Sequence, residues 1–60
     1  MKYKVMFYYN LSGGGNPDGV GSFTFYTLNQ AISACQAWAL TDPGRSTANL
    51  WDGTIWRFYQ

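Results

Sequence analysis

A single helix signal near the middle of the chain constrains its fold more than any other feature. Thr27-Leu28-Asn29-Gln30 matches a capping box, in which the Thr27 hydroxyl accepts from the Gln30 N–H and the Gln30 side chain bonds back to the Thr27 N–H. Asp42-Pro43-Gly44 ends the helix at about Leu40 or Thr41, because proline disfavours helical backbone before it and glycine turns the chain. Between these limits, apolar residues at three- and four-residue spacing predict one buried helix face. That face consists of Leu28, Ala31, Ile32, Cys35, Trp38 and Ala39.

The segments on both sides of this helix carry strand signals. Alternating β-branched and aromatic residues predict strands over residues 2–9 and 22–26. Residues 10–22 between them are rich in glycine and contain Pro17, which predicts a flexible hairpin loop. Residues 48–59 predict a second hairpin with a two-residue type I′ turn at Asp52-Gly53, which places Leu50 opposite Ile55. The order ββαββ predicts an α+β fold in one domain, residues 1–60: a four-stranded antiparallel sheet with the helix packed on one face.

The chain is short and has few residues for cross-links or catalysis. It has 60 residues, one cysteine and no histidine, so we expect no internal disulfide, no metal site and no cofactor. Cys35 lies on the apolar helix face without a base, and the three aspartates each sit beside glycine or proline in a turn. We therefore expect no enzymatic activity. Two routes to stability remain, an aromatic-rich core and self-association.

Aromatic residues make up 20% of the chain, more than one helix and one sheet layer can enclose. Since the helix covers only one sheet face, two arrangements stay open. In the first, the covered face contains Tyr3, Val5, Phe7, Phe23, Phe25, Leu50 and Ile55, and the open face contains Met6, Tyr8, Tyr26, Trp51, Trp56 and Phe58. In the second, the 48–59 hairpin is turned over, so that its tryptophans and Phe58 lie under the helix. Both faces of this hairpin are apolar, so its pattern favours neither arrangement.

These features favour a binding function over catalysis. We expect a protein-interaction module that uses an aromatic sheet face or a strand edge, with itself as a homodimer or with another protein as partner. A small adaptor or inhibitor that a phage encodes and that acts on a host protein is one example of such a module. The residues expected to bind the partner are Tyr8, Tyr26, Trp51, Trp56 and Phe58, with Arg57 as a polar anchor.

The alternative function is single-stranded nucleic-acid binding by stacking of bases on the sheet aromatics. Lys2 and Lys4 share a face with Met6 and Tyr8, but a net charge of +1 gives little attraction to phosphates. No segment has the length of a signal-peptide core or a membrane span. The unpaired Cys35 favours a reducing compartment, so we expect a cytoplasmic protein without a membrane partner.

Overall fold

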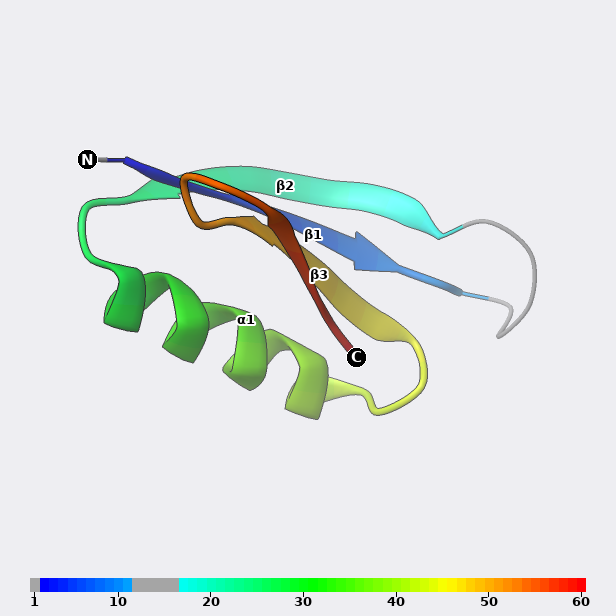
Figure 1. Ribbon diagram of the computed structural model, residues 1–60. Coiled ribbons are helices and arrows are strands. Elements are labelled where there is room, and N and C mark those ends of the chain that lie inside the picture. Colours follow the sequence, from blue (N-terminus) through cyan, green and yellow to red (C-terminus); the bar gives the residue numbers. More distant parts are fainter. Residues whose placement is uncertain (1, 12–16) are drawn as a thin grey trace.

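The computed structural model describes residues 2–11 and 17–60 of the chain. Its elements are the strands β1 (Tyr3–Tyr9) and β2 (Asp18–Phe25), the helix α1 (Leu28–Thr41), and the strands β3 (Ser46–Trp51) and β4 (Trp56–Tyr59). The strands form one sheet in the order β2-β1-β3-β4, and every neighbouring pair is antiparallel. Helix α1 lies across one face of this sheet (Figure 1). The ββαββ order and the α+β fold are therefore confirmed.

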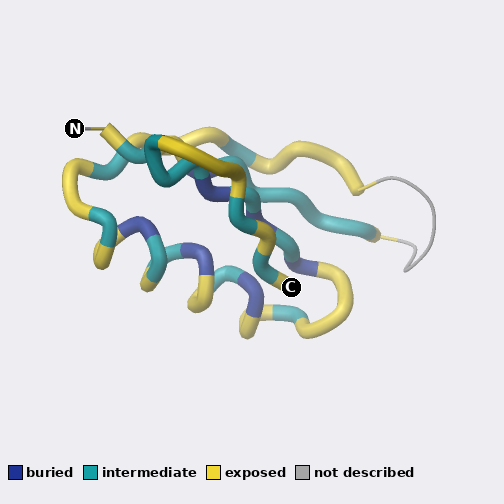
Figure 2. The backbone as a smooth tube through the Cα atoms, in the orientation of Figure 1, coloured by how far each residue is buried: buried dark blue, intermediate teal, exposed yellow. Residues whose placement is uncertain are grey.

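The core lies between α1 and the two central strands. Val5 of β1 and Leu50 of β3 are opposite each other in the sheet, and both are fully buried. On the helix, Ala31, Cys35 and Ala39 follow one another at four-residue spacing and are the buried residues of α1. Their small side chains let the helix approach the sheet closely. Figure 2 shows the result as buried positions on the sheet side of each helical turn and exposed positions on its outer side.

The ends of α1 agree with the sequence prediction. The Gln30 N–H donates to Thr27 Oγ1 at 3.2 Å, so Thr27 is the N-cap. Asp42 is the C-cap, and Gly44 has a φ of +87°, a left-handed conformation that favours glycine. Leu28, Ile32 and Trp38 pack against the buried cluster, which confirms the predicted apolar face.

Strand β2 is longer than the sequence predicted. It begins at Asp18 and not at residue 22, so residues 18–21 belong to the sheet and not to the predicted 10–22 loop. A register shift opposite Phe7 and Tyr8 accommodates the glycine-rich part of the strand as a β-bulge, with Gly21 and Gly19 as their partners. The Phe23 ring lies over Gly21, where an added Cβ would come within 2.9 Å of it. Gly13, Gly14 and Gly15 of the predicted loop lie outside the described residues.

The β3–β4 connection also differs from its prediction. Trp51 pairs with Trp56 and Leu50 with Arg57, so residues 52–55 form a four-residue connection and the predicted two-residue turn is wrong. The reason is the Asp52 side chain, whose Oδ1 accepts from the Thr54 N–H at 2.9 Å and from the Ile55 N–H at 3.0 Å. These bonds stabilise a wider turn and leave Ile55 outside β4, exposed and not on the covered face. Because the pairing moves by two residues, all the remaining residues of the hairpin keep their predicted faces.

Candidate binding surface

The sheet has one face against α1 and one that no described element covers, which we call the open face. In β3, buried and half-buried residues alternate, and the buried Ser46, Ala48 and Leu50 lie on the α1 side. Trp51 therefore points away from the helix, and its partner Trp56 lies on the same side. The structure thus has the first of the two arrangements that the sequence left open. The second, with the hairpin turned over, does not occur because Leu50 and Ala48 fill the space beneath α1.

Two rows of side chains cross the open face from β2 to β4, as the pairing registers define. The first row consists of Thr24, Lys4, Trp51 and Trp56, and the second of Ser22, Met6, Asn49 and Phe58. The hairpin therefore brings Trp51, Trp56 and Phe58 together at the β4 side of the sheet, a group we call the aromatic cluster. The Trp51 and Trp56 rings lie 5.4 Å apart between centroids and are tilted by 52°. Trp56 is 51% exposed and Phe58 is 60% exposed.

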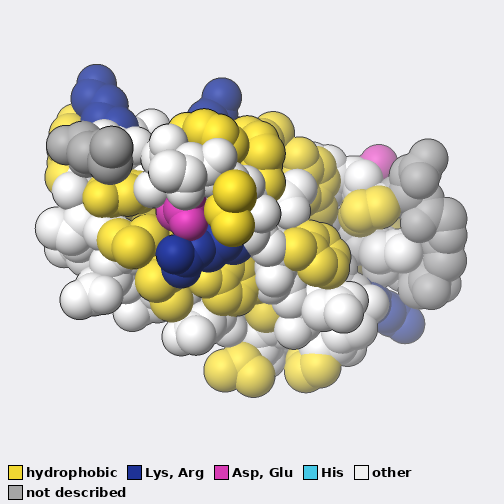
Figure 3. Space-filling model, viewed as in Figure 1, with side chains coloured by type: hydrophobic (Ala, Val, Ile, Leu, Met, Phe, Trp, Pro, Cys, Tyr) yellow, Lys and Arg dark blue, Asp and Glu magenta, His cyan; other side chains and the backbone are white. Residues whose placement is uncertain are grey.

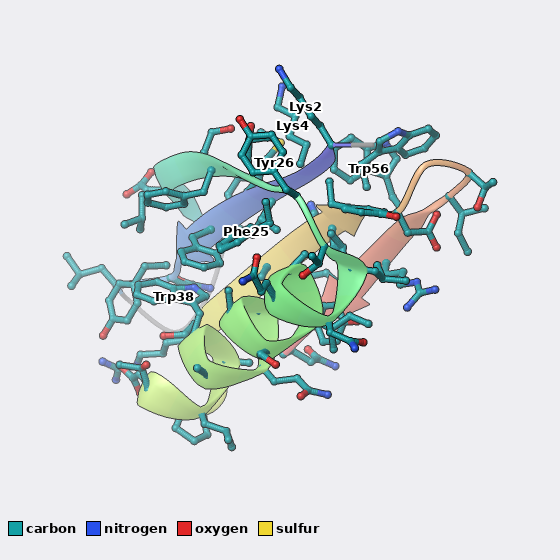
Figure 4. The ribbon with its side chains drawn as sticks, turned by 90° about the vertical axis from the view of Figure 1, so that its left-hand side faces the viewer. Lys2, Lys4, Phe25, Tyr26, Trp38 and Trp56 are labelled. Atoms are coloured by element: carbon teal, nitrogen blue, oxygen red, sulfur yellow. The ribbon has the colours of Figure 1, made fainter. Side chains whose placement is uncertain are left out.

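The two predicted tyrosines lie apart from the aromatic cluster. Tyr8 is opposite Thr47, beyond the second row, and its hydroxyl donates to Met6 Sδ at 3.7 Å. Tyr26 follows the end of β2, at the opposite edge of the sheet from β4, and is 70% exposed. Figure 4 shows Tyr26, Lys2 and Lys4 projecting away from α1. Of the five aromatic residues expected to bind, the structure therefore groups three.

Arg57, expected as the polar anchor beside these rings, lies on the other face. It pairs with Leu50, and its Nε donates to Asp52 Oδ2 at 2.8 Å. The N–H groups of Ile55 and Thr54 are the main reason why the pKa of the Asp52 carboxyl lies well below its usual range. The Asp52 carboxylate in turn raises the pKa of the Arg57 guanidinium. This ion pair holds the turn of the hairpin and leaves Arg57 engaged away from the open face.

Positive charge predominates on the open face. Lys2 and Lys4 are exposed. None of the three aspartates lies on this face in the described chain. Asp18 pairs with Tyr9 on the α1 side, Asp42 accepts a hydrogen bond from the Tyr9 hydroxyl, and Asp52 binds Arg57. Figure 3 shows positively charged side chains at the upper edge, others beside a carboxylate in the middle of the view, and hydrophobic side chains across much of the visible surface.

Catalysis or metal binding would need reactive side chains, above all the Cys35 thiol and the acidic side chains. Cys35 is fully buried, and burial raises the pKa of its thiol to about 11, so the thiolate is disfavoured near neutral pH. The described residues contain no group of three or more His, Cys, Asp or Glu side chains that could hold a metal ion. Ser46 Oγ is buried, and we find no hydrogen-bond partner for it among those residues.

A second apolar surface, not predicted from the sequence, lies between α1 and the edge strand β2. We call it the β2 groove; it has a volume of about 340 Å³. The aromatic residues Phe7, Phe23, Phe25 and Trp38 and the small helix residues Ala34 and Ala37 line it. The alanines leave Phe23 uncovered, and 49% of it is exposed. The apolar pattern of the helix did not predict this groove. The small size of Ala34 and Ala37, which face β2, was the sequence feature that could have indicated it.

Trp38 closes one end of the β2 groove and ties α1 to the sheet. Its ring is stacked on Phe7, with centroids 5.1 Å apart and an interplanar angle of 4°. Its Nε1–H donates to two main-chain oxygens, that of Thr47 at 2.8 Å and that of Tyr8 at 3.1 Å. Figure 4 shows Trp38 and Phe25 between the helix and the sheet.

Within the described residues, no helix is long and apolar enough to cross a membrane. Comparison of the chain with protein-family models, with curated proteins and with solved structures finds no match.

Proposed function

We propose that this chain is a non-catalytic binding module that docks on another protein through the aromatic cluster of its open face. The observation that carries this proposal is the grouping of Trp51, Trp56 and Phe58 on a sheet face that no described element covers, with half or more of Trp56 and Phe58 exposed. Exposed apolar groups of this kind mark interaction sites on small proteins. Tryptophan is also among the residue types that contribute most to binding at interfaces.

The surroundings of the aromatic cluster support a protein partner. Its neighbours in the second row are Asn49 and Met6, which are uncharged, whereas the exposed Lys4 lies in the first row beside Trp51. An uncharged aromatic centre with a polar margin is the usual composition of an interface core and rim.

The groups most suited to catalysis are engaged within the fold, which supports a non-catalytic function. Cys35 is buried, and the Asp42 and Asp52 carboxylates accept hydrogen bonds from other residues of the chain.

Site-specific photocrosslinking tests this proposal. A photoreactive side chain replaces Phe58 in one version of the chain and Leu40, which is 76% exposed on the outer side of α1, in the control version. We expect the same protein to be crosslinked in repeated experiments from position 58 and not from position 40. In the position-58 version, Trp56→Ala should weaken capture by about 30-fold, equivalent to about 2 kcal/mol for the loss of an aromatic anchor. Equal capture from both positions, or capture unaffected by Trp56→Ala in a folded chain, would contradict the proposal.

A second candidate function is binding of single-stranded nucleic acid, which one specific observation favours. Lys2, Lys4 and Tyr26 project from the face that carries the aromatic cluster, and no aspartate of the described chain lies there. Bases can stack on such rings while lysines contact phosphates. Fluorescence anisotropy of a labelled oligothymidine separates the two functions. Binding that weakens as salt rises and is lost in Lys4→Gln supports the second candidate; no binding at low salt excludes it.

A further inference from the structure

We infer that two copies of this chain pair through the outer edge of β2, forming one continuous eight-stranded sheet whose β2 grooves face each other. This inference is independent of the proposed function, because the β2 edge and the aromatic cluster lie at opposite sides of the sheet. Sheet edges are open to pairing with another strand unless short strands, charges, prolines or bulges protect them.

The two edges of this sheet differ in protection. The β4 edge has only four residues and includes Arg57. The β2 edge has eight residues, and from Gly19 to Phe25 none is charged. The bulge opposite Phe7 and Tyr8 interrupts the first half of β2, so regular backbone is left at residues 21–25. This uncharged half of β2 is the part of the sheet least protected against pairing.

The residues of this segment suit antiparallel pairing about a twofold axis at Phe23. In that register each Phe23 lies opposite the other, and each Phe25 lies opposite a Gly21, over which the Phe23 ring of that chain lies. On the open face, Ser22 lies opposite Thr24, a pair that can form a hydrogen bond across the strands. The segment is therefore complementary to itself at every position, and the low net charge of +1 adds little repulsion between copies.

The β2 groove gives this pairing an apolar component. Helix α1 packs mainly over β3 and β1. With neighbouring strands about 4.8 Å apart, the two helix axes of the pair would lie roughly 19 Å apart. Packed helices lie about 8–10 Å apart, so a channel about one helix wide would separate the two helices. The exposed Phe23 and the half-buried Phe25 of both copies lie at the floor of this channel. Pairing would bring the exposed Phe23 rings of the two copies together at this floor and so remove part of their apolar surface from water.

Sedimentation equilibrium across a dilution series tests the inference. The wild-type mass should rise from 6.8 kDa towards twice that value as concentration increases. Phe23→Lys places two like charges at the twofold axis and should raise the dimer dissociation constant by at least about tenfold. The matched control Phe58→Lys puts the same charge on the exposed open face of β4 and should leave the dissociation constant unchanged. A chain that is monomeric at every concentration overturns the inference. So does a dimer disrupted by Phe58→Lys and not by Phe23→Lys.

A crosslinking experiment tests the register without a destabilising charge. In a Cys35→Ala background, Phe23→Cys places two thiols opposite each other at the twofold axis, within reach of a disulfide. Mild oxidation should convert this variant to a covalent dimer much faster than the Phe58→Cys control. Far-ultraviolet circular dichroism of the reduced proteins confirms that both variants are folded. Equal crosslinking rates for the two folded variants would overturn the proposed pairing.

Discussion

The substitution Trp38→Phe tests how α1 is held on the sheet. Phenylalanine keeps a ring that can stack on Phe7 but removes the Nε1–H, which donates to the main-chain oxygens of Thr47 and Tyr8. The lost hydrogen bonds and the carbonyl oxygens deprived of their donor together should lower the free energy of unfolding by about 1–3 kcal/mol. For a domain of this size, each kcal/mol corresponds to a fall in Tm of roughly 4–8 °C.

Urea unfolding followed by circular dichroism measures this effect, because the signal of the helix does not depend on tryptophan fluorescence. Trp56→Phe is the matched control: it removes the same N–H from a ring that is half exposed, and it should change stability by less than about 0.5 kcal/mol. An equal loss in both variants would show that the effect does not depend on the hydrogen bonds of the Trp38 indole. A loss below about 0.5 kcal/mol for Trp38→Phe, with an unchanged m-value, would refute a stabilising role for the indole N–H.

Three further predictions concern the hairpin turn, the thiol and the core. Since the folded-state pKa of Asp52 is depressed, its stabilising effect is present above the pKa of about 4 in the unfolded chain and is lost as pH falls towards the lower folded value. Thermal unfolding between pH 6 and pH 2.5 should therefore show a larger fall in Tm for the wild type than for Asp52→Asn, and equal falls would contradict this. Cys35, buried and with a pKa of about 11, should react with a disulfide reagent only in denaturant; rapid labelling of the native chain would show that the helix opens readily. Leu50→Ala should lower the free energy of unfolding by about 2–5 kcal/mol because Leu50 is fully buried, whereas the exposed Leu40→Ala serves as a control with little expected change, both measured by urea titration.

The sequence by itself determined the element order and the helix, because these depend on local chemistry. The Thr27 hydroxyl lies within one helical turn of the Gln30 N–H that it caps, and Pro43 and Gly44 act on the backbone beside them. The period of the apolar residues likewise places Ala31 and Cys35 against a sheet whatever the sheet contains.

The two corrected elements show where local patterns were insufficient. Asp52-Gly53 is a common two-residue turn, but the Asp52 carboxylate also accepts from Ile55 three residues later, and Arg57 adds a contact across the hairpin. The glycines of β2 suggested a loop, yet extended backbone needs no side chain when β1 supplies the hydrogen bonds. For β2 the deciding partner, β1, lies outside the segment in which the pattern was read. For the turn it is the side chain of Asp52, whose hydrogen bonds the two-residue pattern did not include.

Only the tertiary structure decided which face of the 48–59 hairpin meets the helix, and with it the candidate binding surface. The alternating pattern allows either Leu50 or Trp51 to face the helix, since both are apolar. Pairing of β3 with β1 puts Leu50 opposite Val5, and only compact side chains fit between the sheet and the closely packed Ala31 and Cys35 of α1. The larger Trp51, Trp56 and Phe58 are thereby left on the open face, because the space beneath the helix is too small for them.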